Sequence, residues 1–320
     1  GYLNMTDLLL IGGATPEMLE RLGAAFTVHR LSDAADPVSW LAEHGAKIHY
    51  VATNGHDGVR PDYIKALPNL KLISCYGVGY DAIDTAQAVS RGIWVTHTPN
   101  VLNAEVATTA LMLMLACYRN LLADDAYVRS GKWQTDGNAP LTRTADNRTV
   151  GIVGLGRIGQ AIADKLAPFN AKILYHARNE KSVDYTYYSD LTAMARDSEV
   201  LICITPGGPS THKLVNADVI KALGPEGILI NVSRGSVVDE AALIAALQEQ
   251  RLGAAGLDVF EREPKVPTAL RALSNVVLLP HVGSATHETR AAMGALTVDN
   301  LLQHFEQGTV ISPVPECAKM

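Results

Sequence analysis

The stretch TVGIVGLGRIGQAIADKLAPFNAKILYHARN, residues 149–179, decides the fold of this chain. It begins with an apolar run, and Gly154, Gly156 and Gly159 then form the pattern G-x-G-x-x-G before a helix-forming segment. In this pattern the first glycine allows a tight turn, the second lets backbone approach a pyrophosphate, and the third lets the helix pack on the strand. The helix N-terminus then faces the anion. The stretch therefore predicts a dinucleotide-binding β-α-β unit.

The end of the second strand of that unit indicates which dinucleotide binds. An Asp or Glu at this place would bond the ribose 2′-hydroxyl of NAD, whereas an arginine can neutralise the 2′-phosphate of NADP. The chain has Arg178 and Asn179 there, with Lys181 close by and no carboxylate before Glu180. We therefore expect NADPH to be preferred, with NADH as the alternative cofactor. The competing interpretation is that Arg178 is a solvated surface charge, as charges at strand ends usually are.

Apolar runs separated by helical spacing extend this pattern along the chain. The first series lies at 6–12, 48–53, 71–75 and 93–96, and the second at 149–153, 172–176, 199–204, 227–232, 253–259 and 275–279. Alternating strands and helices predict parallel sheets. One long helical region at 103–131 connects the two series, and residues 287–305 again have amphipathic helical spacing. With 320 residues, two domains are expected.

Composition excludes several classes of protein. The formal net charge is −6, and 48% of the residues are hydrophobic and 19% charged, which suits a compact α/β enzyme. We expect no nucleic-acid partner because no block of Lys and Arg occurs. The apolar stretch 106–118 is too short to span a bilayer, so a buried helix and no membrane association are expected. The four cysteines are far apart, so no metal site is expected, and the first residues, GYLNM, lack leader features, which favours the cytoplasm.

Three residues follow successive apolar runs of the second series: Arg234, Glu263 and His281. Open α/β sheets bind ligands at the carboxyl ends of their strands. Reduction of a 2-oxo acid needs a cation for the carboxylate and carbonyl, and an acid for the forming alkoxide. A carboxylate behind the histidine would hold its tautomer and favour its protonated form. Taken singly, the three residues are better explained as a surface charge, part of an acidic turn and a satisfied core histidine. Their occurrence together after successive apolar runs, beside the nucleotide-binding pattern, favours the catalytic interpretation.

The motifs GLGRIG, NVSRGSVVDE, GLDVFEREP and LLPHVGSAT together resemble those of the D-isomer-specific 2-hydroxyacid dehydrogenase family, over nearly the whole chain. The resemblance implies that Arg234 orients the substrate, that His281 is the acid/base and that Glu263 is its partner. It implies two doubly wound parallel-sheet domains with a catalytic cleft between them. The flavodoxin-like substrate domain would comprise residues 1–99 and 290–320, and the Rossmann cofactor domain residues 100–289. A homodimer is implied as well.

The same resemblance supplies further site residues. SCYGVGYDAID is similar to the substrate loop of the family, where backbone N–H groups around Val78 and Gly79 bind the carboxylate. Asn54 and Gly55 resemble the second wall of the pocket, with a plain turn as the alternative. Tyr76 would stack on a bulky substrate or narrow the pocket. The residues expected to bind the cofactor are Gly154, Leu155, Gly156, Arg157, Ile158, Gly159, Arg178, Asn179, Thr205, Pro206, Thr211, Val232, Ser233, Arg234, Asp258, His281, Gly283 and Ser284.

The substrate class is the least determined part of the prediction. The segment from residue 174 to 191, together with FEREPKVP, looks most like NADPH-linked glyoxylate and hydroxypyruvate reductases and their relatives that act on hydroxyphenylpyruvate. Reduction of glyoxylate and hydroxypyruvate is therefore the preferred expectation, and reduction of a bulkier aromatic or branched 2-oxo acid is the alternative. A nucleotide-sensing binding module, like the co-repressors that share this fold, is the alternative of another class.

Overall fold

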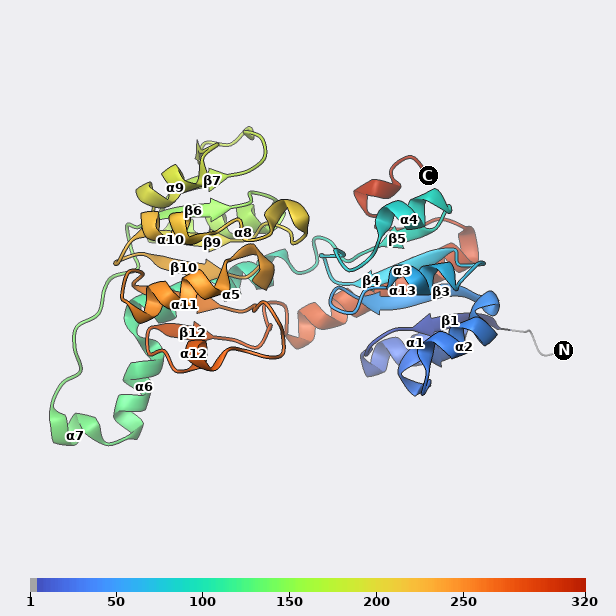
Figure 1. Ribbon diagram of the computed structural model, residues 1–320, viewed down its shortest axis with the longest axis horizontal. Helices are drawn as coiled ribbons and strands as arrows, with labels where there is room; N and C mark the ends of the chain where they lie inside the picture. Colours follow the sequence, from blue (N-terminus) through green and yellow to red (C-terminus); the bar gives the residue numbers. More distant parts are fainter. Residues whose placement is uncertain (1–4) are drawn as a thin grey trace. The chain divides into compact units, whose positions relative to one another are not determined.

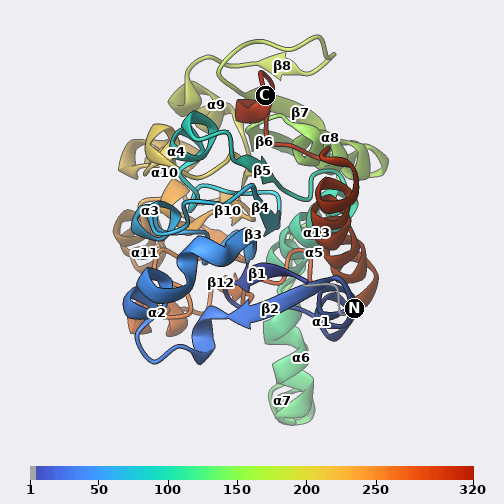
Figure 2. The same cartoon turned by 90° about the vertical axis from the view of Figure 1, so that its right-hand side faces the viewer.

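The computed structural model describes residues 5–320, so the expectation drawn from the first residues lies almost wholly outside it. The chain divides into two compact units: the first is Gly1–Leu102 with Ala285–Met320, and the second is Asn103–Ser284 (Figure 1). The boundaries predicted from the sequence lie at 99/100 and 289/290. Each unit is a parallel sheet with helices on both faces, so the predicted α/β class is confirmed (Figure 2).

The second unit has a seven-stranded sheet with the order β12-β11-β10-β9-β6-β7-β8, all parallel. Its strands are β6 (Thr149–Val153), β7 (Lys172–His176), β8 (Thr186–Tyr187), β9 (Val200–Cys203), β10 (Ile228–Asn231), β11 (Ala254–Leu257) and β12 (Val276–Leu278). The direction of winding reverses between β6 and β9. This is the switch point of the sheet. Doubly wound sheets bind their ligands there, outside the carboxyl ends of the strands.

Helices cover both faces of this sheet. Figure 2 shows α5 (Asn103–Arg119) and α8 (Arg157–Leu166) on one side, and α9 (Leu191–Asp197), α10 (Ala217–Leu223) and α11 (Glu240–Gln248) on the other. The short helix α12 (Thr268–Arg271) precedes β12. Because both faces are covered, β9 and β10 are buried at every position and read as continuous apolar runs, VLIC and ILIN.

The first unit has a five-stranded parallel sheet with the flavodoxin-like order β2-β1-β3-β4-β5. Its strands are β1 (Thr6–Leu10), β2 (Phe26–Arg30), β3 (Ile48–Asn54), β4 (Leu72–Tyr76) and β5 (Trp94–Thr96). Helices α1 (Pro16–Ala25) and α13 (His287–Gln307) cover one face, and α2 (Pro37–His44), α3 (Pro61–Lys65) and α4 (Thr85–Ser90) cover the other (Figure 2). Helix α13, which the amphipathic spacing predicted, thus returns the chain to this sheet.

The sequence prediction was wrong about two strands and one helix. Strand β2 was not expected, because this edge strand has only five residues and buries Phe26 alone, which leaves too little apolar signal. The edge strand β8, with only two residues, was not expected either. The long helix expected at 103–131 is two helices, α5 and α6 (Leu121–Arg129), bent by 60°. Asn120 between them has a positive φ of 47°, which no helical residue adopts. A short helix α7 (Lys132–Asp136) follows.

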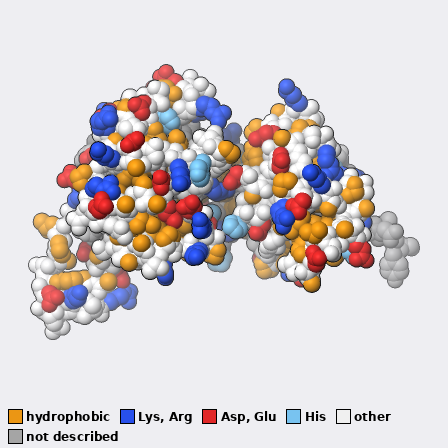
Figure 3. Space-filling model, viewed as in Figure 1, with side chains coloured by type: hydrophobic (Ala, Val, Ile, Leu, Met, Phe, Trp, Pro, Cys, Tyr) orange, Lys and Arg blue, Asp and Glu red, His pale blue; other side chains and the backbone are white. Residues whose placement is uncertain are grey.

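Two surface properties bear on the classes of partner. On the face shown in Figure 3, acidic and basic side chains are interspersed over both units. Among residues 5–320, no single helix is long and apolar enough to cross a membrane, and only the bent pair α5 and α6 meets the length and composition together. Helix α5 buries eight of its residues inside the second unit.

Candidate active site

The turn after β6 is built so that only glycine fits at two of its positions. Gly154 has a φ of +94°, and a Cβ there would lie 2.8 Å from the Cα of Thr205, which follows β9. A Cβ on Gly159 would lie 2.7 Å from the carbonyl oxygen of Gly154. The first and third glycines are therefore required by the turn and by the packing of α8 on the sheet.

Gly156 is different, because a Cβ on it would meet no atom within 4 Å. It is the N-cap residue of α8, and no side chain caps this helix. The N-terminus of α8 thus faces open space with uncapped N–H groups, as an approaching pyrophosphate requires. Leu155 is buried beneath the turn, whereas Arg157 is exposed beside it.

Arg178 and Asn179 lie just beyond the end of β7, and both are exposed. In the described part of the chain, the Arg178 side chain makes no ion pair and no hydrogen bond, so its charge is available to a ligand. Beyond β9, Thr211 donates a hydrogen bond of 2.6 Å from Oγ1 to the carbonyl of Pro206 and closes that loop. These loops belong to the strands on the two sides of the switch point.

The loop after β10 is organised by a buried amide. Asn231, the last residue of β10, is 1% exposed. Its Oδ1 accepts hydrogen bonds from the N–H and the hydroxyl of Ser233, at 3.0 and 2.8 Å, and its Nδ2 donates to the carbonyl of Arg234 at 3.0 Å. A Cβ on Gly235 would overlap the backbone of Phe260, so this loop packs directly on the loop after β11. The backbone of Arg234 is therefore fixed from two sides.

His281 and Glu263 form a close pair at the carboxyl ends of β12 and β11. The distance from His281 Nδ1 to Glu263 Oε2 is 2.6 Å, and Glu263 Oε1 accepts a hydrogen bond of 3.0 Å from the N–H of Phe260. The side chain of Glu263 is 20% exposed and that of His281 is 43% exposed. The carboxylate thus fixes a proton on Nδ1 and leaves Nε2 to act toward solvent or a ligand. His281 also has a φ of +54°, an uncommon left-handed conformation of the kind that concentrates at functional sites.

Asp258 holds the backbone that follows His281. Its carboxylate accepts hydrogen bonds from the N–H groups of Val282 at 2.7 Å and Gly283 at 2.8 Å. Burial raises the pKa of Asp258 above its ordinary value, although these two N–H groups and the nearby His281 act in the opposite direction. On the other side, the carbonyl of Gly283 accepts a hydrogen bond of 3.1 Å from Thr109 of α5. The conformation of the 281–284 loop is therefore set by two buried side chains.

These loops all lie at the carboxyl ends of the strands of one sheet. Comparison with known protein families identifies the family of the chain. Residues 111–283 match the family described as D-isomer specific 2-hydroxyacid dehydrogenase, NAD binding domain. The chain belongs to this family. As a member of it, the chain is a nicotinamide-dependent oxidoreductase that reduces 2-oxo acids.

Individual relatives of this dehydrogenase carry several substrate names. The chain is 45% identical to hydroxyphenylpyruvate reductase of Plectranthus scutellarioides over 276 residues, which cover 86% of this chain and 88% of the relative. It is 42% identical to 2-ketogluconate reductase of Gluconobacter oxydans, with 96% and 98% covered. Its structure is similar to that of the NADPH-dependent glyoxylate/hydroxypyruvate reductase of Sinorhizobium meliloti in complex with NADP and malonate, with a TM-score of 0.92, 45% identity and 97% of each chain covered.

The remaining candidate residues of the dehydrogenase lie in its first unit. The N–H groups of Val78 and Gly79 donate no hydrogen bond within residues 5–320, so they are open to a ligand. Tyr76 is half-buried, and the guanidinium of Arg290 lies 5.9 Å from the centre of its ring. Asn54 uses its side chain in a turn, because Oδ1 accepts from the N–H groups of residues 56 and 57 at 3.0 and 2.8 Å. The turn that was the alternative for Asn54 is therefore present, and Gly55 donates to the carbonyl of Tyr76 at 3.2 Å.

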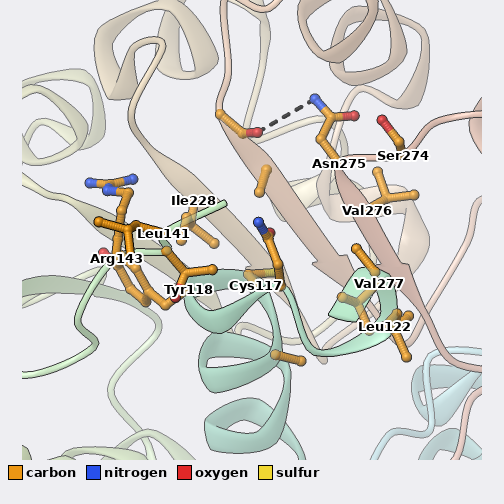
Figure 4. A pocket seen from close by; sticks show the side chains of 16 residues that line it. Cys117, Tyr118, Leu122, Leu141, Arg143, Ile228, Ser274, Asn275, Val276 and Val277 are labelled. Carbon is orange, nitrogen blue, oxygen red and sulfur yellow. Dashed lines mark hydrogen bonds between the residues drawn. The ribbon is translucent and has the colours of Figure 1, made fainter. Parts of the chain in front are cut away.

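A pocket of about 240 Å³ lies at the opposite edge of the seven-stranded sheet (Figure 4). Ile228, Ala254 and Val276 line it, and they stand at the amino ends of β10, β11 and β12. Cys117 and Tyr118 from the end of α5 close it from another side. Because Arg234, Glu263 and His281 follow the carboxyl ends of the same three strands, this pocket is separate from the candidate active site.

Two residues that organise the site were not identified from the sequence. Asn231 stands at the start of the quoted motif NVSRGSVVDE, two residues before Ser233, so its position was a usable signal. Thr109 lies in the middle of an apolar helix, 174 residues before its partner Gly283, and no local pattern reveals that contact. Among the described residues, no cluster of three or more His, Cys, Asp or Glu side chains could hold a metal ion.

Proposed function

We propose that the chain is an NADPH-dependent reductase of small 2-oxo acids, which converts glyoxylate to glycolate and hydroxypyruvate to D-glycerate. The observation that carries the proposal is the 2.6 Å pair of His281 and Glu263, on loops next to the one that carries Arg234. Such a pair supplies a positioned acid, and the neighbouring guanidinium supplies fixed positive charge. The likeness to a glyoxylate/hydroxypyruvate reductase of the same overall length supports the substrate class.

The reaction requires each residue in a defined role. When bound, the reduced nicotinamide supplies the hydride that adds to the carbonyl carbon of the substrate. Arg234 binds the carboxylate and carbonyl oxygens and stabilises the negative charge that develops on the latter. His281 donates the proton from Nε2 to that oxygen, and Glu263 stabilises the imidazolium through Nδ1. In the first unit, the open N–H groups of Val78 and Gly79 hold the substrate carboxylate.

The residues around the glycine turn fit a dinucleotide, and we assign its contacts to them. Gly156 and the N-terminus of α8 would receive the pyrophosphate, because the space in front of them is open. Arg178 would pair with the 2′-phosphate of NADP, and Asn179 lies beside it. Thr205, Pro206, Thr211, Val232, Ser233, Asp258, Gly283 and Ser284 keep the cofactor contacts predicted for them.

The cofactor preference is tested by exchanging Arg178 for alanine. An exposed arginine that pairs with a phosphate contributes a charge-assisted hydrogen bond, so the KM for NADPH should rise about 10- to 100-fold. The KM for NADH, which has no 2′-phosphate, should stay within about twofold, because this contact is then absent. Steady-state kinetics with both cofactors measure this, with Arg196→Ala on α9 as the matched surface control. Equal KM values for the two cofactors in the parent enzyme would reject the NADPH preference.

The same assays, extended over substrates, test the function itself. We expect the highest kcat/KM for glyoxylate and hydroxypyruvate, and lower values for hydroxyphenylpyruvate and 2-ketogluconate. The second candidate function is reduction of bulkier 2-oxo acids, which the 45% identity to a hydroxyphenylpyruvate reductase favours. A preference for hydroxyphenylpyruvate would establish that candidate, and absence of NADPH or NADH oxidation with every 2-oxo acid would overturn both.

We also propose that two copies associate through the arm formed by α6, α7 and the segment up to residue 144. Neither helix buries a residue within the chain, and the arm extends from the second unit (Figure 1) with apolar side chains on its surface (Figure 3). The exposed fractions are 56% for Leu121, 55% for Leu122, 59% for Val128, 59% for Trp133 and 99% for Leu141. Concentrated apolar exposure of this kind marks a protein interface.

Light scattering at micromolar concentration tests the association. The parent protein should have the mass of a dimer, and the double variant Leu121→Asp with Trp133→Glu should have that of a monomer, because charges are then buried without partners. Phe305→Glu, at an exposed apolar position of the first unit, is the control and should stay dimeric. A monomeric parent protein, or a dimeric double variant, would contradict the proposed interface.

A further inference from the structure

The predicted substrate loop of the first unit is held from one side only. Residues 77–80 follow the carboxyl end of β4, and the N–H groups of Val78 and Gly79 point to no acceptor among residues 5–320. Their carbonyl groups, in contrast, are occupied. The carbonyl of Val78 accepts a hydrogen bond of 2.9 Å from Nδ1 of His97, and Cys75 Sγ lies 3.8 Å from the carbonyl of Gly79. The loop is thus fixed from behind, with its donors left open.

The segment after β5 supplies the inner part of this support. Thr98 pairs with Gly77 twice, because the N–H of Gly77 donates to Thr98 Oγ1 at 3.0 Å and the N–H of Thr98 donates to the carbonyl of Gly77 at 2.8 Å. His97 is the next support, through Val78. Because Nδ1 of His97 faces a carbonyl oxygen, the proton must lie on this nitrogen.

Tyr80 provides the outer part of the support. Its hydroxyl donates to the carboxylate of Glu316, at 2.8 Å from Oε2 and 3.2 Å from Oε1. Its ring packs edge-on against His97, with ring centres 5.2 Å apart and an interplanar angle of 85°. Burial and the adjacent carboxylate both raise the pKa of Tyr80, so the hydroxyl keeps its proton at neutral pH and remains a donor.

Glu316 belongs to the C-terminal segment, which is itself anchored to β5. The N–H of Val314 donates to the carbonyl of Val95 at 2.9 Å, and the thiol of Cys317, 1% exposed, lies against the N–H of Val95 at 3.4 Å. Ser312 donates from Oγ to the carbonyl of His97 at 2.7 Å. The chain is thus anchored on both sides of Glu316, and the carboxylate of Glu316 has a defined place beside Tyr80.

We propose that Tyr80, Glu316 and His97 are positioning residues, which hold the amides of Val78 and Gly79 in the orientation that binds the substrate carboxylate. This inference rests on the proposed role of that loop. Two adjacent N–H groups bind a carboxylate well only when their directions are set beforehand, because ordering a free loop at each binding event costs conformational entropy. The C-terminal segment therefore controls substrate affinity without touching the substrate.

The test removes single atoms from this support. Tyr80→Phe deletes only the hydroxyl, and Glu316→Ala deletes the acceptor, whereas Glu316→Gln keeps an acceptor oxygen. In the first two variants we expect the KM for glyoxylate and the dissociation constant of oxamate, a non-reducible analogue, to rise about 5- to 20-fold, since the charge-assisted hydrogen bond between the two side chains is lost. The value of kcat should change less than about twofold, and Glu316→Gln should recover most of the affinity. Tyr63→Phe, which removes a hydroxyl elsewhere in the same unit, should behave as the parent.

Hydrogen exchange of the peptide that covers residues 77–83 is the second readout, and it does not depend on turnover. The amide hydrogens of this peptide should exchange faster in Tyr80→Phe and Glu316→Ala than in the parent, while the melting temperature and the affinity for NADPH stay unchanged. Unaltered KM and exchange in both variants would overturn the inference. A fall in kcat together with a rise in the KM values for both cofactor and substrate would show a general structural role and would overturn the inference too. If the parent enzyme neither reduces 2-oxo acids nor binds oxamate, the proposed function fails instead.

Discussion

Replacement of His281 is expected to lower kcat by about 10²- to 10⁴-fold, the usual contribution of a positioned general acid. The substrate oxygen must then take its proton from water, while KM and the affinity for NADPH should change little. His281→Asn is the sharper variant, because asparagine tolerates the φ of +54° at this position better than alanine does. Stopped-flow measurement of NADPH oxidation gives the rate of the chemical step.

The partner of His281 provides a graded test of the same step. Glu263→Gln keeps an oxygen that can accept from Nδ1 but removes the negative charge, so kcat should fall by about 10- to 100-fold, less than on loss of the histidine. Glu261→Gln removes a charge two residues away, from an exposed side chain, and serves as the control. Full activity in both His281→Asn and Glu263→Gln would contradict the assignment of the acid.

Replacement of Arg234 by alanine is expected to have the largest effect on kcat/KM, a loss of about 10⁴-fold. About 10²- to 10³-fold of this is lost stabilisation of the developing oxyanion, and the remainder is lost binding of the carboxylate. Both KM and kcat should therefore change, unlike in the variants of His281. Arg234→Lys should recover only a small part, because an ammonium group cannot form the two parallel hydrogen bonds of a guanidinium.

Circular dichroism and NADPH binding must show that Arg234→Ala is folded. The backbone of residue 234 is held by Asn231 through its carbonyl, a contact that the alanine variant keeps. Arg251→Ala, on the surface between α11 and β11, is the matched control and should retain parental kinetics. If Arg234→Ala had normal KM and reduced kcat only, the guanidinium would act on the oxyanion alone and its role in binding the carboxylate would be wrong.

The nucleotide-binding part of the fold could be predicted because its information is local. Gly154, Gly156 and Gly159 stand in one turn between a strand and a helix, so their spacing can be recognised from adjacent sequence alone. Six of the seven strands of the second unit were found with nearly correct bounds, since sheets covered on both faces leave continuous apolar runs in the sequence, and only the two-residue strand β8 was missed. Strand β2 shows the limit of this signal, because an edge strand buries too few residues to be recognised.

The candidate catalytic residues could be proposed from the sequence because each follows a strand that was itself recognisable. The residues that hold the site loops in place could not be predicted, because they act through contacts between distant parts of the chain. Thr109 and Gly283 are 174 residues apart, and Tyr80 and Glu316 are 236 apart. Asn120 illustrates another kind of failure, since helical periodicity continues across it while its backbone does not. Only the three-dimensional structure shows these features.

We propose that Arg234 and the Nε2 atom of His281 together receive the negative oxygen formed on hydride transfer. A crystal structure of the enzyme with NADP and oxamate tests this most directly. We expect the guanidinium of Arg234 and the imidazole Nε2 of His281 both to lie about 2.7–3.2 Å from the amide carbonyl or carboxylate oxygens of oxamate. Glu263 should remain paired with Nδ1. Oxamate bound away from both side chains, with NADP in place, would contradict it.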